Sequence, residues 1–322
     1  KELWKMAVEG VGKGEQKPDF KEILYDKRNM VATVTINRPK VYNAYSTNTL
    51  KEWTRAFDDI SDDDSIGVAI LTGAGQAFCT GGDVKEYATV YQNAPHRYWN
   101  YMVTFDKAVT SIRNCRVPVI ARVNGITAGG GNELHQACDL SIASESAKFL
   151  QVGVRVGSVA AGGATQWLPI LIGDRRARWM LYTTDEVDAA TAEQWGLVNR
   201  VVPAGRLDEA VQELCNKILT KFPECLRYTK VQVNFWKDLA WNSTIQHARD
   251  WLALHMGSAE AMEGMRAFVE KRPPDYIGLR KRLASGEVPE LPWGQPIRVC
   301  PKCGAREIPE QFKFCGVCGS KL

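Results

Sequence analysis

The chain has 322 residues, of which 45% are hydrophobic and 24% are charged, proportions that are ordinary for a soluble globular protein with a substantial core. Its formal net charge of +4 is too small to indicate a nucleic-acid partner, and no run of about 20 apolar residues predicts a membrane span. The polar N-terminus predicts no signal peptide, and the cysteines scattered through residues 79–225 favour a reducing, cytoplasmic location.

The first half of the chain alternates short apolar runs with segments of helical periodicity. Apolar residues at every second position predict strands, with a polar turn near Asp26–Asn29, and Thr47 is placed to cap a helix. This alternation predicts an α/β fold. The expected elements are two strands within residues 22–36, a helix from 47 to about 60, a strand over 67–72, a helix over 95–114, a strand over 117–123, a helix over 130–137, and strands at 140–143 and 148–149.

Helical periodicity dominates the second half, until Pro273 and Pro274 end it. The expected elements are helices over 175–182, 189–195, 207–221, 225–237 and 244–269, and a strand over 198–202. A segment rich in proline and glycine then marks a linker. The predicted organisation is an N-terminal arm over 1–19, a core over 20–205, a helical region over 206–283, a linker over 284–297 and a separate terminal segment over 298–322.

Two glycine-rich loops, residues 77–86 and 124–133, each follow an apolar strand and lead toward a helix. Glycine at such a junction lets backbone N–H groups face a ligand without an intervening Cβ. Two such loops side by side can offer two donors to one developing oxyanion. Either loop alone is equally consistent with a tight turn and no ligand.

Several strings in the same order, INRP, AYSTNTL, AFCTGGDVKEY, PVIARVNGITAGGGNEL, CDLSIASESAKF and TAEQWGLVNRVVP, resemble the crotonase (enoyl-CoA hydratase/isomerase) superfamily over roughly residues 20–275. The resemblance implies a spiral of ββα turns followed by a helical region that forms homotrimers or homohexamers. It also implies a coenzyme A thioester as substrate, with the oxyanion amides at Gly82 and Gly130. Further contacts with the substrate are implied at Ala44, Thr80, Asp83 and Lys85, the last of these near a CoA phosphate.

The catalytic carboxylates depart from the pattern of a two-glutamate hydratase. Glu133 matches one of the two glutamates, but Gly153 stands where the other is expected, so an acid or base for simple hydration is missing. The segment around Ser158 is instead similar to ring-opening hydrolases that act on 2-ketocyclohexanecarboxyl-CoA or 6-oxocyclohex-1-ene-1-carbonyl-CoA, although the former carry an aspartate where this chain has Ala160. We therefore expect hydrolytic opening of a cyclic β-oxo acyl-CoA.

Other readings stay open for the site and for the function. Asp83, Thr80, Ser158 and His135 are candidate helpers of Glu133, yet each also fits a purely structural role, and Glu133 itself suits the first turn of a helix. The alternative activity is hydration of an enoyl-CoA or dienoyl-CoA. A non-enzymatic scaffold is the remaining alternative, against which the Glu133 carboxylate and the intact glycine loops count.

The terminal segment carries two Cys-x-x-Cys pairs, Cys300 with Cys303 and Cys315 with Cys318. Four thiolates at this spacing predict a closed, structural Zn²⁺ site, a zinc ribbon that depends on the metal for folding. Two disulfides or an iron site are the alternatives. The segment has no dense basic stripe, so we expect it to dock on its own or a partner subunit instead of on nucleic acid.

Overall fold

The structure, a computed structural model, describes residues 19–91, 94–286, 297–305, 308–309 and 312–322. Nearly all of the predicted N-terminal arm and most of the predicted linker lie outside the described residues. Among the described residues, no helix combines the length and the apolar character that a bilayer-spanning segment needs.

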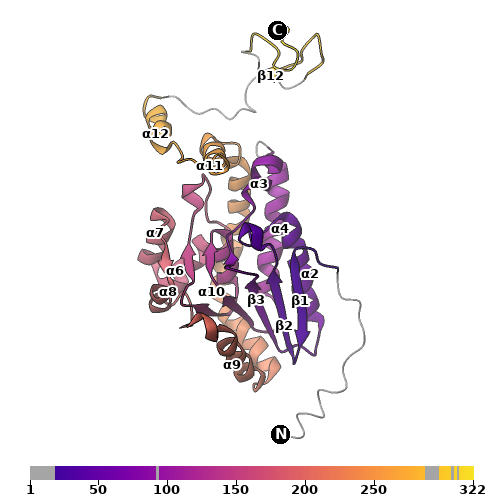
Figure 1. Ribbon diagram of the computed structural model, residues 1–322, viewed down its shortest axis with the longest axis vertical. Helices are drawn as coiled ribbons and strands as arrows, with labels where there is room; N and C mark the ends of the chain where they lie inside the picture. The colour runs from indigo at the N-terminus through magenta and orange to yellow at the C-terminus, as the bar shows by residue number, and fades with distance from the viewer. Residues whose placement is uncertain (1–18, 92–93, 287–296, 306–307, 310–311) are drawn as a thin grey trace.

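A six-stranded sheet forms the centre of the core, in the order β1-β2-β3-β5-β7-β10 (Figure 1). β1 and β2 pair antiparallel, and all other neighbours pair parallel. The strands are β1 (Ile23–Arg28), β2 (Val31–Ile36), β3 (Val68–Gly73), β5 (Val119–Val123), β7 (Leu140–Ser144) and β10 (Arg200–Val202). The predicted turn near Asp26–Asn29 is wrong, because the chain turns only at Asn29 and Met30, both at positive φ, as a two-residue hairpin requires.

A second, smaller sheet turns the chain into a spiral. It contains β4 (Ala77–Cys79), β6 (Ile126–Ala128), β8 (Lys148–Leu150) and β9 (Val187–Asp188). Along the chain, β4 follows β3, β6 follows β5 and β8 follows β7. Each turn of the spiral therefore supplies one strand to the large sheet and the next strand to the small sheet. β4, β6 and β9 were not predicted, since strands of two or three residues are too short to show a period.

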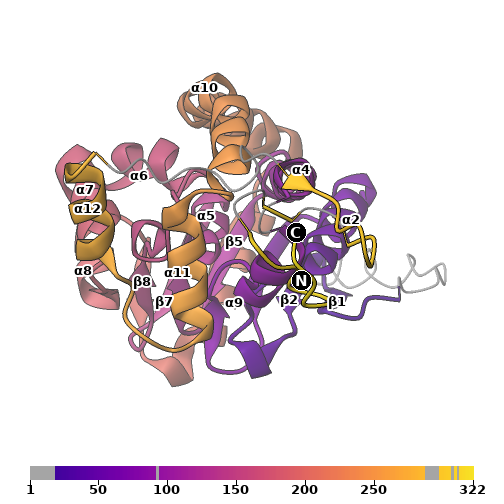
Figure 2. The same ribbon diagram turned by 90° about the horizontal axis from the view of Figure 1, so that it is seen from above.

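Eleven α-helices cover the sheets within the described residues (Figures 1 and 2). They are α2 (Thr47–Asp62), α3 (Val84–Glu86), α4 (Pro95–Arg113), α5 (Gly130–Ala137), α6 (Ala164–Ile172), α7 (Asp174–Thr183), α8 (Ala189–Trp195), α9 (Leu207–Leu219), α10 (Pro223–His255), α11 (Ala259–Val269) and α12 (Tyr276–Ala284). Single turns lie at η1 (Pro39–Val41), η2 (Tyr87–Tyr91), η3 (Gly153–Arg155) and η4 (Ala204–Arg206).

The large sheet is buried on both faces, as its apolar strands predict. One face packs against α9, where Val211 and Cys215 contact the cluster around Val68 and Ile120. The other face belongs to the main core, which includes Trp53 of α2 together with much of α4 and α6. This rigid core lies directly behind the loops that follow the strands.

The observed helices differ from the predicted ones at the cap of α2, in the extent of α10 and α11, and in two helices that were not predicted. Ser46, not Thr47, caps α2, because its hydroxyl accepts the amide hydrogens of Asn48 and Thr49. The helices expected over 225–237 and 244–269 are instead one continuous α10 and a separate α11, since the polar residues between them lie on an exposed helical face. α6 and α12 were not predicted. α6 begins after Gly163, at φ 135, and contains Pro169, whereas α12 starts at an Asp275 cap beyond the two prolines.

The terminal segment contains a two-stranded antiparallel sheet, β11 (Ile297–Arg298) with β12 (Ile308–Pro309). Its buried core consists of Cys300, Ile308 and Cys315. Glycines 304 and 319, which follow the second cysteine of each pair, adopt φ of 72 and 69 degrees, a conformation that glycine takes without strain.

Candidate active site

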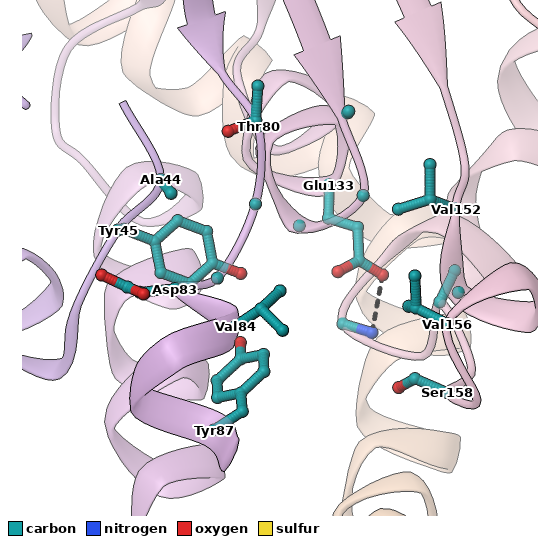
Figure 3. A pocket seen from close by; sticks show the side chains of 18 of the residues that line it. Ala44, Tyr45, Thr80, Asp83, Val84, Tyr87, Glu133, Val152, Val156 and Ser158 are labelled. Atoms are coloured by element: carbon teal, nitrogen blue, oxygen red, sulfur yellow. Dashed lines mark hydrogen bonds between the residues drawn. The ribbon is translucent and has the colours of Figure 1, made fainter. Parts of the chain in front are cut away.

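A pocket of about 600 Å³ opens where the loops after the strands meet α4, α5 and α11 (Figure 3). All but one of the residues predicted to act on or bind the acyl-CoA line it, namely Ala44, Thr80, Gly82, Asp83, Lys85, Gly130, Glu133 and Ser158, and the exception is His135. Apolar side chains, among them Met102, Phe105, Leu252 and Met265, form much of the remaining wall. The spiral therefore gathers into one cavity residues that lie far apart in the sequence.

The two predicted oxyanion glycines lie on neighbouring loops. Within the described residues, the backbone N–H groups of Gly82 and Gly130 donate no hydrogen bond to the protein. A Cβ added to Gly81 would lie 3.1 Å from the Gly130 nitrogen, which shows how closely the two loops approach. Gly130 opens α5, so its amide also lies at the positive end of a helix dipole. The two free amides can receive a negatively charged oxygen, and the oxyanion role stays a prediction.

Glu133 lies in the first turn of α5, and its side chain reaches the pocket (Figure 3). Its Oε1 accepts the amide hydrogens of Gly162, at 2.8 Å, and of Ala164, at 3.3 Å. Burial raises the pKa of the carboxyl to about 7, although these two hydrogen bonds act in the opposite direction. A carboxyl with such a pKa can both accept and release a proton near neutral pH.

The other carboxylates of the pocket are held by basic partners. Asp83 pairs with Arg38 at 2.9 Å and caps α3 by accepting the Lys85 amide hydrogen. Glu186 pairs with Lys148 at 2.6 Å. Among the described pocket residues, Glu133 is thus the one carboxyl without a cationic partner, which singles it out as the candidate acid or base.

The remaining predicted helpers divide into two groups. Ser158 stays a candidate, because its side chain lies in the pocket, whereas the Thr80 hydroxyl donates to the Tyr42 carbonyl oxygen at 3.1 Å. His135 does not line the pocket. Its Nε2 lies 2.8 Å from the Ser141 hydroxyl, and burial lowers its pKa to about 3, so it is a neutral packing residue.

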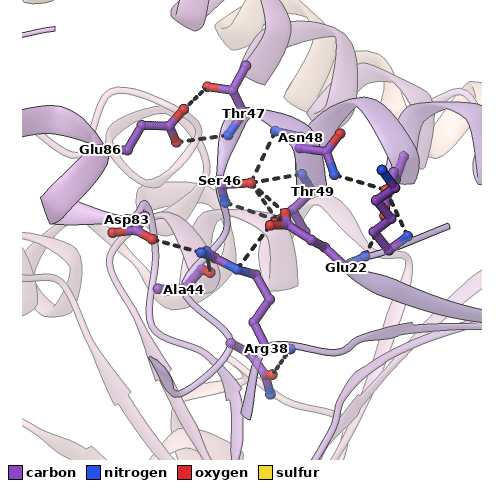
Figure 4. A network of polar contacts seen from close by, with 12 residues as sticks. Glu22, Arg38, Ala44, Ser46, Thr47, Asn48, Thr49, Asp83 and Glu86 are labelled. Carbon is purple, nitrogen blue, oxygen red and sulfur yellow. Dashed lines mark hydrogen bonds and ion pairs between the residues drawn. The ribbon is translucent and has the colours of Figure 1, made fainter. Parts of the chain in front are cut away.

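The sequence interpretation missed Arg38, which fixes the first oxyanion loop (Figure 4). Its guanidinium donates to the Ala44 carbonyl oxygen and to Asp83, and its Nε lies 3.4 Å from Glu22. Further along the loop, Glu86 accepts from the Thr47 amide at 2.9 Å and from its hydroxyl at 2.7 Å. The signal was present in the INRP string, but nothing in the sequence indicates what this arginine contacts.

It also missed the tyrosines of the pocket, Tyr45, Tyr87, Tyr98 and Tyr101. Their hydroxyls add polar groups to a wall that is otherwise largely apolar. Helical spacing places Tyr98, Tyr101 and Phe105 on one face of α4, and that spacing is equally typical of ordinary core residues. Only the fold shows that this face borders a cavity.

The four cysteines of the terminal segment form a separate cluster. Their sulfur atoms all lie within 4.8 Å of one another, and the Cys300–Cys318 and Cys303–Cys315 separations are both 3.7 Å. Tetrahedral coordination with bonds of about 2.3 Å places thiolates about 3.8 Å apart, whereas a disulfide needs about 2.05 Å. The arrangement fits one metal ion held by four thiolates, and it does not fit the alternative of two disulfides.

Comparison with known proteins places this geometry in context. A profile described as enoyl-CoA hydratase/isomerase matches residues 26–279. Two relatives, from Geobacter metallireducens and Thauera aromatica, bear the name 6-oxocyclohex-1-ene-1-carbonyl-CoA hydrolase. The first is 35% identical, with 83% of this chain and 83% of the relative covered, and the second is 34% identical, with 81% and 82% covered.

Solved structures show the same fold. An enoyl-CoA hydratase from Mycobacterium avium subsp. paratuberculosis superposes with a TM-score of 0.72 at 26% identity, over 80% of this chain and 98% of that one. An enoyl-CoA hydratase from Bacillus anthracis superposes with a TM-score of 0.64 at 33% identity, over 80% and 100%. None of these matches covers the whole chain.

Proposed function

We propose, from the premise that this chain belongs to the enoyl-CoA hydratase/isomerase family, that it hydrolytically opens the ring of a cyclic β-oxo acyl-CoA. One observation carries the proposal. The pocket holds two free glycine amides and one unpaired carboxyl, Glu133, while the position of a second catalytic glutamate is Gly153. The names of the relatives from Geobacter and Thauera support this choice among the activities of the family.

The proposed reaction uses the thioester as an electron sink. Glu133 takes a proton from water, whose oxygen adds to the ring carbonyl carbon. The bond from that carbon to the α-carbon then breaks, and its electron pair forms the thioester enolate, whose oxygen binds the amides of Gly82 and Gly130. Protonation of the α-carbon completes an open-chain dicarboxylic acid monothioester. If the ring also contains a double bond, a first water adds there, again with Glu133 as base.

The test uses two substrates that differ in saturation. 2-Oxocyclohexane-1-carbonyl-CoA has no double bond, so only ring opening adds water to it. We expect a product heavier by one water, whose NMR spectrum shows a new carboxyl carbon in place of the ketone carbon beside the retained thioester carbon. 6-Oxocyclohex-1-ene-1-carbonyl-CoA is expected to gain two waters. An enzyme that leaves the saturated ring closed and adds one water to the unsaturated ring contradicts the proposal.

That contradicting result would support the alternative, an enoyl-CoA or dienoyl-CoA hydratase. The observation in its favour is the fold similarity to solved enoyl-CoA hydratases. Against it stands the pocket, where no second carboxyl without a basic partner accompanies Glu133 among the described residues.

The cysteine cluster and the surface of α10 suggest two further features of the protein. We propose that Cys300, Cys303, Cys315 and Cys318 hold a structural Zn²⁺, since four thiolates leave no open coordination position for catalysis. We also propose a homotrimer or homohexamer, because α10 lies at the edge of the molecule (Figure 2) and exposes Val233 and Trp236 by 71% and 66%, with Phe222 just before the helix exposed by 80%. Sedimentation at the mass of one chain would contradict this assembly.

A further inference from the structure

Tyrosine side chains crowd one wall of the pocket. The rings of Tyr87, Tyr98 and Tyr101 lie within 6.0 Å of one another by their centroids, and Tyr45 stacks on Phe105 at 5.8 Å. Tyr45, Tyr98 and Tyr101 are buried, and Tyr87 is partly buried against the same core. A buried phenol hydroxyl is costly unless it forms a hydrogen bond, so an apolar acyl chain alone would be better served by phenylalanine at these positions.

Two of these hydroxyls lie directly beside the oxyanion glycines. A Cβ built on Gly82 would lie 1.6 Å from the Tyr87 hydroxyl oxygen, and a Cβ on Gly130 would lie 1.9 Å from the Tyr45 hydroxyl oxygen. Figure 3 shows both hydroxyls directed into the space between the tyrosine rings and Glu133. An acyl group whose thioester oxygen binds the two amides would therefore pass within reach of both phenols.

The three hydroxyls of Tyr45, Tyr87 and Tyr101 have more protons than acceptors. The Tyr87 and Tyr101 oxygens are 2.5 Å apart and share one hydrogen bond. Three hydroxyls carry three protons, and this hydrogen bond uses one of them. No other described side chain or backbone group hydrogen-bonds to any of them. Burial raises the pKa of each phenol, so all three protons are present at neutral pH.

We infer that Tyr45, Tyr87 and Tyr101 form a binding site for a second oxygen atom of the acyl group, namely a ring ketone next to the thioester. This inference rests on the proposed function and adds its specificity. A spare phenol proton needs an acceptor, and a ketone oxygen supplies one where a methylene does not. When water adds to that ketone, its oxygen becomes negatively charged, and the same donor stabilises the charge without transferring its proton.

The test compares two CoA esters that differ by this one oxygen. Glu133→Gln protein, in which turnover is stopped, is titrated by calorimetry with 6-oxocyclohex-1-ene-1-carbonyl-CoA and with cyclohex-1-ene-1-carbonyl-CoA. We expect the oxo ester to bind about tenfold more tightly. Adding Tyr45→Phe and Tyr87→Phe together should bring the ratio of the two dissociation constants close to one, while the affinity for the deoxy ester stays the same.

Tyr25→Phe is the matched control, because Tyr25 donates its hydroxyl to Asp59 far from the pocket. It should leave the ratio unchanged. Equal affinities in the parent protein, or a ratio that survives the double variant, would overturn the inference. If the double variant binds neither ester, each single variant is measured for the same ratio. Failure of the proposed function would look different: wild-type protein would prefer the oxo ester and yet leave its ring closed.

Discussion

In the pocket, the groups placed to stabilise a reacting oxygen are backbone N–H groups, whereas in the terminal segment the ligating atoms are side-chain sulfurs. The pocket amides are positioned by steric contact, since Gly82 and Gly130 leave no room for a Cβ beside Tyr87 and Tyr45. Among the described residues, the cysteine sulfurs have a small buried core of Cys300, Ile308 and Cys315 around them. A region of this size needs a metal to supply its folding energy.

This difference determines which substitutions each region tolerates. The pocket is closely packed by a large core, so an added atom is harmful and a lost hydroxyl leaves the fold intact. In the cysteine cluster, an added atom on the exposed surface matters little, whereas loss of one ligand removes the source of stability. Substitutions in the two regions should therefore differ both in what they change and in how far the effect spreads.

The largest expected loss of turnover follows Glu133→Gln. The amide keeps the size of the side chain and can still accept the Gly162 hydrogen through its oxygen, but it cannot take a proton from water. We expect kcat to fall by about 10²–10⁴-fold, the range for a lost general base. Calorimetry should show nearly unchanged binding of the CoA ester. Turnover close to that of the wild type would remove Glu133 from the mechanism.

Gly82→Ala should cost about 10²–10³-fold in kcat, because the new Cβ collides with the Tyr87 hydroxyl and displaces the first oxyanion amide. Steady-state kinetics with the ring substrate measures the loss. Gly205→Ala is the control, since a Cβ there meets no atom within 4 Å. Equal activity of the two variants would show that the Gly82 amide does not contact the reacting oxygen.

The pH dependence of activity and of stability tests the protonation state of Glu133. Because Glu133 must be ionised to act as a base, kcat/KM should rise about tenfold per pH unit below its pKa of about 7 and level off above it.

The free energy of unfolding should change with pH in the opposite sense. A pKa raised from 4.5 favours the folded state at low pH, and this contribution, about 3 kcal/mol, is lost as the pH rises through 7.

The stability part is measured by urea unfolding of the wild type and of Glu133→Gln at pH 5 and pH 8.5. The difference between the two proteins isolates the carboxyl, since all other titrating groups are shared. A free-energy difference that does not vary with pH, together with a kcat/KM profile that is flat near pH 7, would contradict the raised pKa.

Arg38→Lys should have a smaller effect, about tenfold in kcat/KM. A lysine cannot contact Asp83, Glu22 and the Ala44 carbonyl oxygen at the same time, so the loop that carries Gly82 becomes less well positioned. Arg28→Lys, at an exposed ion pair with Asp26, is the control. The loss should appear in kcat with the melting temperature unchanged, and an equal effect of both substitutions would contradict a positioning role for Arg38.

For the cysteine pairs the spacing itself specifies the chemistry, whereas for the glycine loops the spacing left the function open and the resemblance to a known family supplied the predicted roles. The resemblance to the crotonase superfamily implied that Gly82, Gly130 and Glu133 serve one acyl-CoA site, and the structure places all three in the same cavity. The cysteine spacing likewise predicts four sulfurs around one centre. In the large sheet and in most helices, apolar periodicity was sufficient to predict the element.

The tyrosines and Arg38 were not predictable for the opposite reason. Tyr45, Tyr87 and Tyr101 come from three separate segments, and no spacing links them. Whether such a tyrosine faces a core or a cavity depends on elements that lie much later in the sequence, such as α11, whose Met265 lines the pocket. The continuity of α10 was also hidden, because a long helix with an exposed apolar face has no clear polar side to mark its course.

The smallest expected effect on turnover comes from the cysteine cluster. Cys303→Ser removes one of four ligands, so bound zinc measured by mass spectrometry should fall from about one ion per chain to near zero. Turnover and the main melting transition should not change, because the described pocket residues extend only as far as Phe268. Cys225→Ser, at an exposed cysteine of α10, is the matched control and should keep the metal. If Cys303→Ser lost activity while Cys225→Ser kept it, the two regions would not be independent, and the metal-bound segment would have to contact the pocket of its own or a neighbouring chain.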